Sequence, residues 1–263
     1  MKIGVSSYAF RWAIKARALD VLGLLEKSAA LGAEVVQILD NFALDEFSDA
    51  QLDDIAQGAR QLGLSLEVGI VGSQPEQLRR NLVVAQKLDA HILRVVLSHG
   101  DWQPTVADLA PILRDLLPAL RAAKVTLAIE NHFDLTPSEL VTLLQTIDDP
   151  RVGVCLDPLN SISQMIGPRQ VIAALAPYTV SAHCKDGVVT RVNTGFYIAG
   201  CPLGTGRVEL REMLAALRAA KRAPNLLVEA WMDRLEDTDA TLAQEENWVR
   251  EGIAYLKQLT DDH

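Results

Sequence analysis

Four apolar segments in the second half of the sequence each end in a side chain that could bind a metal ion or carry a proton. These side chains, each given with its segment, are Glu130 in LAIENH, Asp157 in VGVCLD, His183 in TVSAHC and Glu229 in NLLVEA. Carboxylate and imidazole ligands in this ratio suit Mn²⁺ or Mg²⁺, with Co²⁺ or Zn²⁺ as further options. Without a cation, neighbouring carboxylates would repel one another, and one or two would have to be protonated. The alternative is four unrelated residues, each paired with a local base.

The chain alternates between short β-branched segments and amphipathic helical segments, and this alternation would position such side chains. Eight segments have the pattern of strands: 3–8, 34–39, 64–70, 92–97, 126–131, 152–157, 179–184 and 225–230. Alternation with a period of roughly 30 residues favours parallel strands joined by helices, and eight units favour closure. We therefore predict an α/β fold, a single (β/α)8 TIM barrel that occupies residues 1–263 as one domain. A doubly wound open sheet is the alternative, but no GxGxxG motif follows the first strand.

Strand ends and strand faces decide where the chemistry would lie. In a (β/α)8 barrel the carboxyl ends of the strands form the active-site face. Side-chain alternation places Glu130 on the inner face of its strand together with Thr126 and Ala128. The same rule points Glu67 and Arg94 into the barrel, where we expect them to form a buried ion pair.

Composition limits the classes of function. A net charge of −9 disfavours non-specific nucleic-acid binding, which needs a cationic surface. No apolar run reaches the roughly 18 residues of a membrane span, and the segment MKIGVSSYAF begins a strand pattern rather than a signal peptide. We therefore expect a cytoplasmic protein with no membrane or nucleic-acid partner. Cys155, Cys184 and Cys201 form no CxxC pair, and we expect them to be reduced and structural.

Five segments in a fixed order carry a resemblance to a known family. The segments IENH, LDPLNS, HCKD, PLGTGRVEL and VEAW resemble the xylose isomerase-like TIM barrels, and more narrowly the sugar phosphate isomerase/epimerase group. The resemblance implies one divalent metal ion held by Glu130, Asp157, His183 and Glu229. It also implies that Glu130 and Glu229 are an acid/base pair on opposite faces of the carbon that changes configuration. The implied function is an isomerase or epimerase of a keto sugar or sugar derivative that works through an enediolate.

Three residues depart from a plain epimerase. Asn160 stands where many epimerases of the group have a histidine near the substrate, while Lys185 and His132 add a cation and a second imidazole. Such groups could bind a carboxylate or phosphate, or protonate a leaving group. A metal-dependent lyase, a dehydratase or decarboxylase of a sugar-derived keto acid, is therefore the alternative function. Lys185 could also simply pair with Asp186 or with another neighbouring carboxylate.

Further candidates surround the expected barrel mouth. Tyr8, Trp12 and Trp231 could shape a carbohydrate pocket, because aromatic rings offer an apolar face and a polar edge. Core packing is the equal alternative for these residues. Arg191 lies in the long connection 187–207, which could close over a substrate, although a solvated loop is the default. The chain has five histidines, too few for a DNA-repair nuclease on this fold, and a homo-oligomer stays open.

Overall fold

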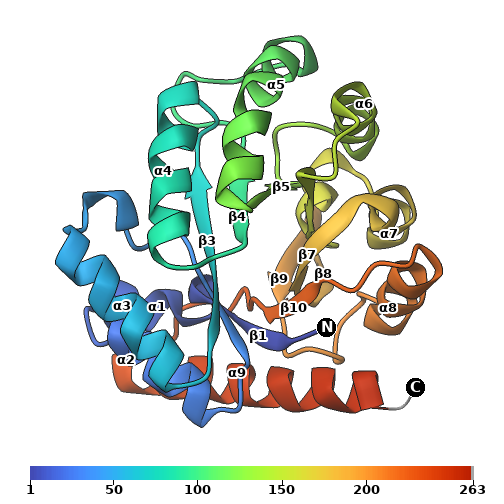
Figure 1. Ribbon diagram of the computed structural model, residues 1–263. Coiled ribbons are helices and arrows are strands. Elements are labelled where there is room, and N and C mark those ends of the chain that lie inside the picture. The colour runs from blue at the N-terminus through green and yellow to red at the C-terminus, as the bar shows by residue number, and fades with distance from the viewer. Residues whose placement is uncertain (262–263) are drawn as a thin grey trace.

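The computed structural model describes residues 1–261, and its centre is a closed barrel of eight parallel strands (Figure 1). The strands are β1 (Ile3–Ser6), β2 (Val35–Ile38), β3 (Ser65–Val71), β4 (Ile92–Val96), β5 (Thr126–Glu130), β6 (Val152–Leu156), β7 (Thr179–Cys184) and β10 (Asn225–Val228). Their order around the barrel is β1-β10-β7-β6-β5-β4-β3-β2. The predicted (β/α)8 barrel is confirmed, since each predicted strand segment coincides with one barrel strand, with β3 extending one residue beyond the predicted 64–70.

Helices surround the barrel on its outer side (Figure 1). The helices are α1 (Arg11–Lys15), α2 (Val21–Ala30), α3 (Asp49–Gln61), α4 (Pro75–Lys87), α5 (Val106–Ala123), α6 (Pro137–Ile147), α7 (Pro168–Leu175), α8 (Leu210–Ala219) and α9 (Thr238–Asp261). Four short 3-10 turns lie at 7–10, 44–46, 160–164 and 176–178. Among residues 1–261, none of the helices combines the length and apolar character that crossing a membrane requires.

The apolar core lies between the strands and the helices, not inside the barrel. In β5, Leu127 and Ile129 belong to this core, whereas the alternate residue Ala128 does not. The inner positions of other strands are polar and fully buried, as for Gln37 on β2 and Ser181 on β7. A polar interior must be hydrogen-bonded throughout, because unpaired buried polar groups are costly. This requirement links the strands to the candidate site described below.

The predicted ion pair between Glu67 and Arg94 is wrong. The β3–β4 register pairs Arg94 with Gly69, so Glu67 lies one inner layer nearer the amino ends of the strands. Arg94 instead pairs with Glu130, with Nε 2.5 Å from Oε2, and its Nη1 lies 3.4 Å from Asp40 Oδ1. Alternation correctly indicated which face each side chain occupies, but the stagger of adjacent strands decides which side chains meet.

The long connection after β7 contains an antiparallel hairpin that the sequence analysis did not predict. Strands β8 (Gly187–Val192) and β9 (Gly195–Gly200) pair with Val192 opposite Gly195 across a two-residue turn. The sequence does carry a hairpin pattern here, since β-branched or aromatic residues flank the short polar turn at 193–194. The base of the hairpin packs closely on the loop after β10: a Cβ on Gly200 would lie 2.1 Å from the Trp231 carbonyl oxygen.

Two glycine substitutions test the closure of the barrel. A Cβ added at Gly4 on β1 would lie 1.9 Å from the Val35 carbonyl oxygen on β2. Gly4→Ala should therefore lower the free energy of unfolding by about 1–3 kcal/mol. The control is Gly58→Ala in α3, where the nearest atom would be 3.4 Å away and the gain in helix propensity should stabilise by about 0.5–1 kcal/mol. Urea denaturation measures both, and equal effects of the two changes would contradict this account.

Candidate metal and substrate site

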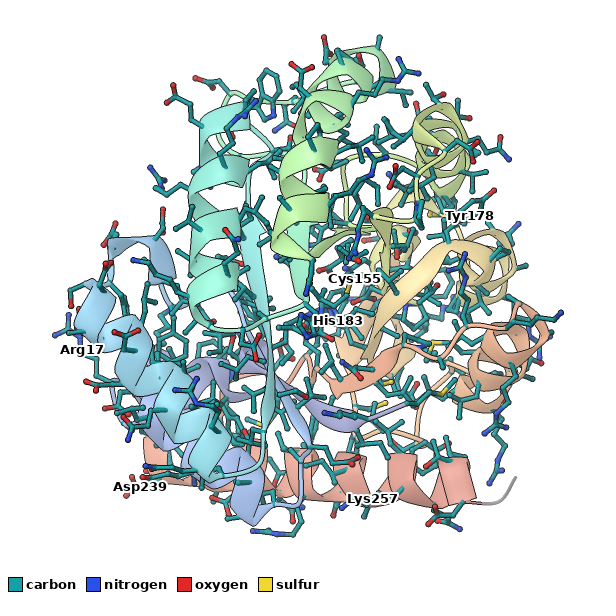
Figure 2. The ribbon with its side chains drawn as sticks, viewed as in Figure 1. Arg17, Cys155, Tyr178, His183, Asp239 and Lys257 are labelled. Atoms are coloured by element: carbon teal, nitrogen blue, oxygen red, sulfur yellow. The ribbon has the colours of Figure 1, made fainter. Side chains whose placement is uncertain are left out.

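The four predicted metal ligands come from four neighbouring strands and meet at one point. Glu130 ends β5, Asp157 follows β6, His183 lies on β7 and Glu229 follows β10, and these strands are adjacent in the barrel. From His183 Nδ1 the nearest oxygens of Glu130, Asp157 and Glu229 are 3.6, 3.6 and 3.3 Å away. All four side chains are buried. Figure 2 shows His183 near the centre of the molecule, with Cys155 beside it.

The chemistry of this cluster fits a divalent cation. His183 Nδ1 is buried and has no hydrogen-bond partner, although three carboxylate oxygens surround it. Asp157 Oδ2 is paired with the ammonium of Lys185 at 2.7 Å. A buried ring nitrogen without a partner, surrounded by carboxylate oxygens, is an atom that a metal ion would engage. Glu130, Asp157, His183 and Glu229 are therefore suited to hold one divalent cation.

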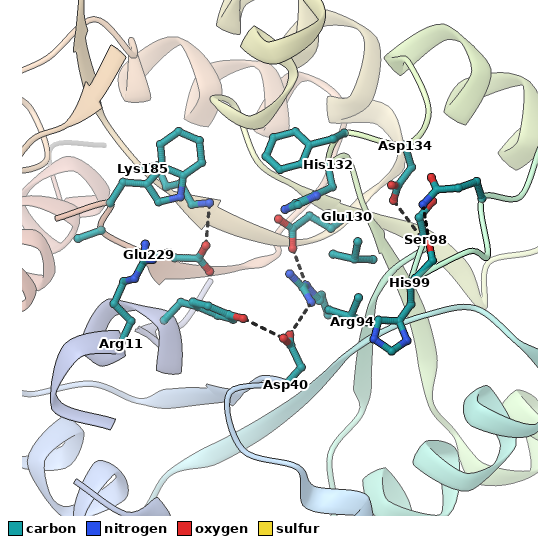
Figure 3. A pocket seen from close by; sticks show the side chains of 18 residues that line it. Arg11, Asp40, Arg94, Ser98, His99, Glu130, His132, Asp134, Lys185 and Glu229 are labelled. Atoms are coloured by element: carbon teal, nitrogen blue, oxygen red, sulfur yellow. Dashed lines mark hydrogen bonds and ion pairs between the residues drawn. The ribbon is translucent and has the colours of Figure 1, made fainter. Parts of the chain in front are cut away.

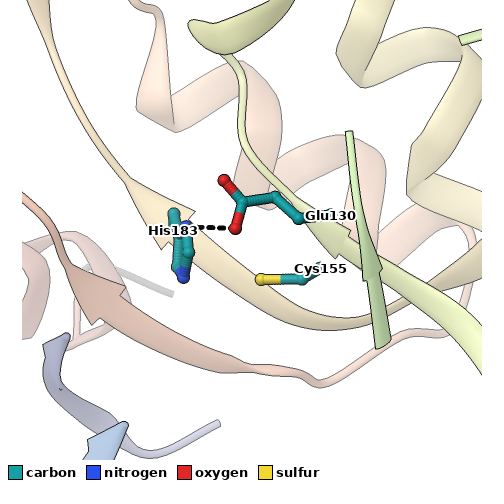
Figure 4. A group of neighbouring side chains, drawn as sticks. All are labelled: Glu130, Cys155 and His183. Carbon is teal, nitrogen blue, oxygen red and sulfur yellow. Dashed lines mark ion pairs between the residues drawn. The ribbon is translucent and has the colours of Figure 1, made fainter. Parts of the chain in front are cut away.

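Cys155 lies beside the cluster but is a poorer ligand. Its sulfur is grouped with Glu130 and His183, all of their ligand atoms lying within 4.8 Å of one another (Figure 4). Burial raises the pKa of the Cys155 thiol, and a metal ion binds the thiolate rather than the thiol. The oxygen-rich remainder of the cluster accordingly favours a hard cation over a soft one.

Glu130 is held from both sides. Arg94 Nε donates to its Oε2 at 2.5 Å, and Asn160 Nδ2 donates to its Oε1 at 2.6 Å. Burial alone would raise the pKa of Glu130, but the charges of Arg94, His183 and Lys185 hold the pKa well below its ordinary value. Glu130 is thus a fixed carboxylate with both oxygens engaged, a state that suits a ligand better than a group that takes up protons.

Lys185 is a buried ammonium between two of the cluster's carboxylates. Its Nζ lies 2.7 Å from Asp157 Oδ2, 2.7 Å from Glu229 Oε1 and 4.6 Å from the centre of the Trp231 ring. Burial would lower the pKa of Lys185, but the carboxylates raise it above its ordinary value. The sequence left Asp186 or another neighbouring carboxylate open as the partner of Lys185. The structure pairs the Lys185 ammonium with Asp157 and Glu229. Asp186 instead accepts hydrogen bonds from backbone N–H groups of the following segment.

A cavity of about 610 Å³ is lined by two members of the cluster, Glu130 and Glu229 (Figure 3). Of the residues predicted to contact substrate or metal, those that line the cavity are Tyr8, Glu130, His132, Lys185, Glu229 and Trp231. Tyr8 is fixed by a hydrogen bond from its hydroxyl to Asp40 Oδ2 at 2.8 Å. Partial burial lowers the pKa of the His132 imidazole, so at neutral pH this side chain is a neutral polar group rather than a second cation.

Three predicted substrate contacts lie elsewhere. Asn160 does not line the cavity, but it links Glu130 to Lys185, whose Nζ lies 3.3 Å from Asn160 Oδ1. Trp12 lines a separate cavity and donates its indole N–H to the Met232 carbonyl at 2.8 Å. Arg191 is exposed on the β8–β9 hairpin and is not among the lining residues. Only some of the side chains predicted to contact a substrate therefore line the cavity.

Other cavity residues were not predicted as part of a site. Arg11, Asp40 and Phe133 line the cavity, and so does Arg94, whose Nε donates to Glu130. Asp40 carries a recognisable signal in the sequence, because this carboxylate lies two residues after β2, near the same rim at which β5, β6 and β10 deliver theirs. Arg11 lies on the short helix α1 after β1 and carries no comparable signal in the sequence.

Comparison with known proteins defines the class. The family profile described as "Xylose isomerase-like TIM barrel" matches residues 25–259, and the chain belongs to this family. Over 261 residues it is 33% identical to the 3-oxo-isoapionate decarboxylase of Pectobacterium atrosepticum, covering 97% of this chain and 95% of that protein.

Two solved structures share the fold. The D-psicose 3-epimerase of Clostridium cellulolyticum H10, solved with D-tagatose, has a TM-score of 0.76 and 20% identity, covering 99% of this chain and 98% of that one. A xylose isomerase-like protein of Mycobacterium smegmatis, solved with magnesium, has a TM-score of 0.72 and 15% identity, covering 96% of each chain.

Arg94 should be essential for stability in the metal-free protein. Arg94→Met leaves the buried Glu130 carboxylate without its main partner, so the free energy of unfolding should fall by about 3–5 kcal/mol. Arg191→Met, at an exposed arginine, is the control and should change it by less than about 0.5 kcal/mol. Urea denaturation in the presence of a chelator measures both, and a small effect of Arg94→Met would show that Glu130 is not a buried charge.

Metal addition should stabilise the protein. If the four ligands bind a cation, Mn²⁺ at 100 times its Kd should raise the free energy of unfolding by about 2.7 kcal/mol, with a matching rise in Tm. Asp157→Asn should remove most of this rise, whereas Asp53→Asn on the exposed face of α3 should keep it. Thermal denaturation with and without Mn²⁺ makes the comparison. An unchanged rise in Asp157→Asn would place the metal elsewhere.

Proposed function

We propose that this protein is a divalent-metal-dependent decarboxylase of a sugar-derived 3-oxo acid. The observation that carries the proposal is the double engagement of Glu130 by Arg94 and Asn160. An epimerase that removes a proton from one face and returns one to the other needs two carboxylates free to exchange protons. Glu229 is engaged in the same way, since Ser6 Oγ donates to its Oε2 at 2.7 Å and the Lys185 ammonium lies 2.7 Å from its Oε1. Decarboxylation needs no base, and it consumes a single proton at the carbon that loses CO2.

Support for an acidic substrate comes from Lys185. It is a buried cation that lines the cavity, where its ammonium pairs with Glu229 (Figure 3) and with Asp157. An ammonium in this position suits a substrate carboxylate. The relative at 33% identity is named for the same class of reaction on a 3-oxo acid. The neutral His132 imidazole and the Trp231 ring complete a wall with polar edges and an apolar face.

The reaction can be written around this chain's own residues. A divalent cation held by Glu130, Asp157, His183 and Glu229 would supply a Lewis acid for the 3-oxo group. Lys185 orients the carboxylate; the bond between the carboxyl carbon and C2 then breaks, CO2 leaves, and the electron pair stays as an enolate. The vacated side of C2 faces Lys185, whose Nζ donates a proton to that carbon, and solvent restores the lysine. Asp157 and Glu229 keep the ammonium aimed at this position.

Epimerisation of a keto sugar is the second candidate. Glu130 and Glu229 both line the cavity, as an acid/base pair would have to, and the epimerase cited above shares the fold. The two functions predict different isotope patterns in D2O. A decarboxylase places one deuterium on the carbon that lost CO2, whereas an epimerase exchanges the α-hydrogen of a ketose without loss of carbon.

A substrate screen with Mn²⁺, Mg²⁺ or Co²⁺ tests the proposal. CO2 release from 3-oxo sugar acids should be measured beside product formation from keto sugars. Lys185→Met should lower CO2 release by about 100-fold or more, because it removes the cation and the proton, while the Mn²⁺ content should be kept. Lys27→Met, at a partly exposed helix residue, is the control. Exchange and epimerisation of keto sugars, without CO2 release from any 3-oxo acid, would overturn the decarboxylase.

A further inference from the structure

A chain of buried hydrogen bonds lies beneath His183 and crosses the barrel interior. His183 Nε2 lies 2.7 Å from Gln37 Oε1, and Gln37 Nε2 donates to Glu67 Oε2 at 2.9 Å. Ser181 Oγ and Asn225 Nδ2 also donate to Glu67, at 2.8 and 2.7 Å. Gln37, Glu67, Ser181 and His183 are at most 1% exposed. This relay joins strands β2, β3, β7 and β10, and neither the metal ligands nor the cavity lining includes Gln37 or Glu67.

The donor and acceptor roles along the relay follow from its far end. Three donors converge on Glu67, an arrangement that a carboxylate satisfies because it has only acceptors. Gln37 must therefore turn its NH2 group to Glu67 and its carbonyl oxygen to His183. A carbonyl oxygen accepts, so the proton on the His183 ring lies on Nε2. In the neutral ring the lone pair then lies on Nδ1, the nitrogen that must be free of its proton before a cation can bind there.

The free nitrogen is the one that faces the carboxylates. Nδ1 is the His183 atom within 3.6 Å of oxygens of Glu130, Asp157 and Glu229, and it has no hydrogen-bond partner. With the opposite tautomer, an N–H bond would point into the cluster and block a cation from that nitrogen. The protonation state of His183 Nδ1 is thus coupled, through Gln37, to the Glu67 carboxylate.

We propose that Glu67 and Gln37 are positioning residues that hold His183 in the Nε2–H tautomer and so present Nδ1 to a divalent cation. The inference rests on the metal site of the proposed function, and it adds two residues that act through His183 without touching the substrate. Glu67 sets the orientation of the Gln37 amide, and the amide sets the tautomer. Ser181 and Asn225 keep Glu67 in place from two further strands.

The tautomer can be read in the metal-free protein at a pH high enough for a neutral ring. Burial would lower the pKa of His183, but the neighbouring carboxylates raise this pKa and favour the doubly protonated ring below it. Side-chain ¹⁵N NMR of His183 in the wild-type protein should show Nε2 protonated and Nδ1 unprotonated. Gln37→Met, which keeps the length of the side chain, and Glu67→Gln should each populate the other tautomer. Mn²⁺ titration should show a Kd raised by about 10- to 100-fold in both variants. The control is Thr179→Val, because Thr179 is buried on the same strand but bonds the Leu175 carbonyl instead.

Each outcome bears on the inference. A shifted tautomer and a weaker Mn²⁺ affinity in Gln37→Met or Glu67→Gln, with both unchanged in Thr179→Val, would support it. Either variant suffices if circular dichroism shows that the other does not fold. A neutral wild-type His183 ring protonated on Nδ1, or an unchanged Mn²⁺ Kd in the folded variants, would overturn it. These measurements need no substrate, so a failure of CO2 release in the wild-type protein would count against the proposed reaction alone.

Discussion

Three carboxylates buried around one imidazole are the constraint on which the rest of this structure depends. Each charge removed from water is costly unless other charges and hydrogen bonds compensate. The chain supplies two cations of its own, since Arg94 pairs with Glu130 and Lys185 bridges Asp157 and Glu229. Such internal compensation separates this protein from small metallodomains that fold only around their metal.

The barrel makes this concentration of charge possible. Parallel strands bring the carboxyl ends of β5, β6, β7 and β10 to one rim, while the layer below is a polar interior that is hydrogen-bonded from strand to strand. The apolar core is displaced to the space between strands and helices. The apolar packing that stabilises the fold therefore lies between the strands and the helices, and charged groups can occupy the axis of the barrel.

Much of this arrangement could be predicted from sequence because it depends on periodicity. Glu130, Asp157, His183 and Glu229 were found as polar ends of apolar strands, and parallel strands necessarily bring such ends together. What could not be predicted depends on stagger between strands and on side-chain reach. Arg94 meets Glu130 rather than Glu67 because of the β3–β4 register, and Trp12 is turned to Met232, away from the cavity. The hairpin was harder to predict for another reason: its two strands have six residues each and are largely exposed, so they lack the buried pattern that marks the barrel strands.

The hairpin β8–β9 has an anchored base and a free tip. Its base is packed against the backbone of Trp231, two residues after Glu229, whereas Phe196 near the tip is 73% exposed. A substitution at the base would therefore displace the segment that carries Glu229, whereas a substitution at the tip would not. The tip is the part of the rim where the sequence can drift or lengthen during evolution without disturbing the charged cluster. The charged cluster at the centre of the barrel is in this way insulated from changes at the hairpin tip.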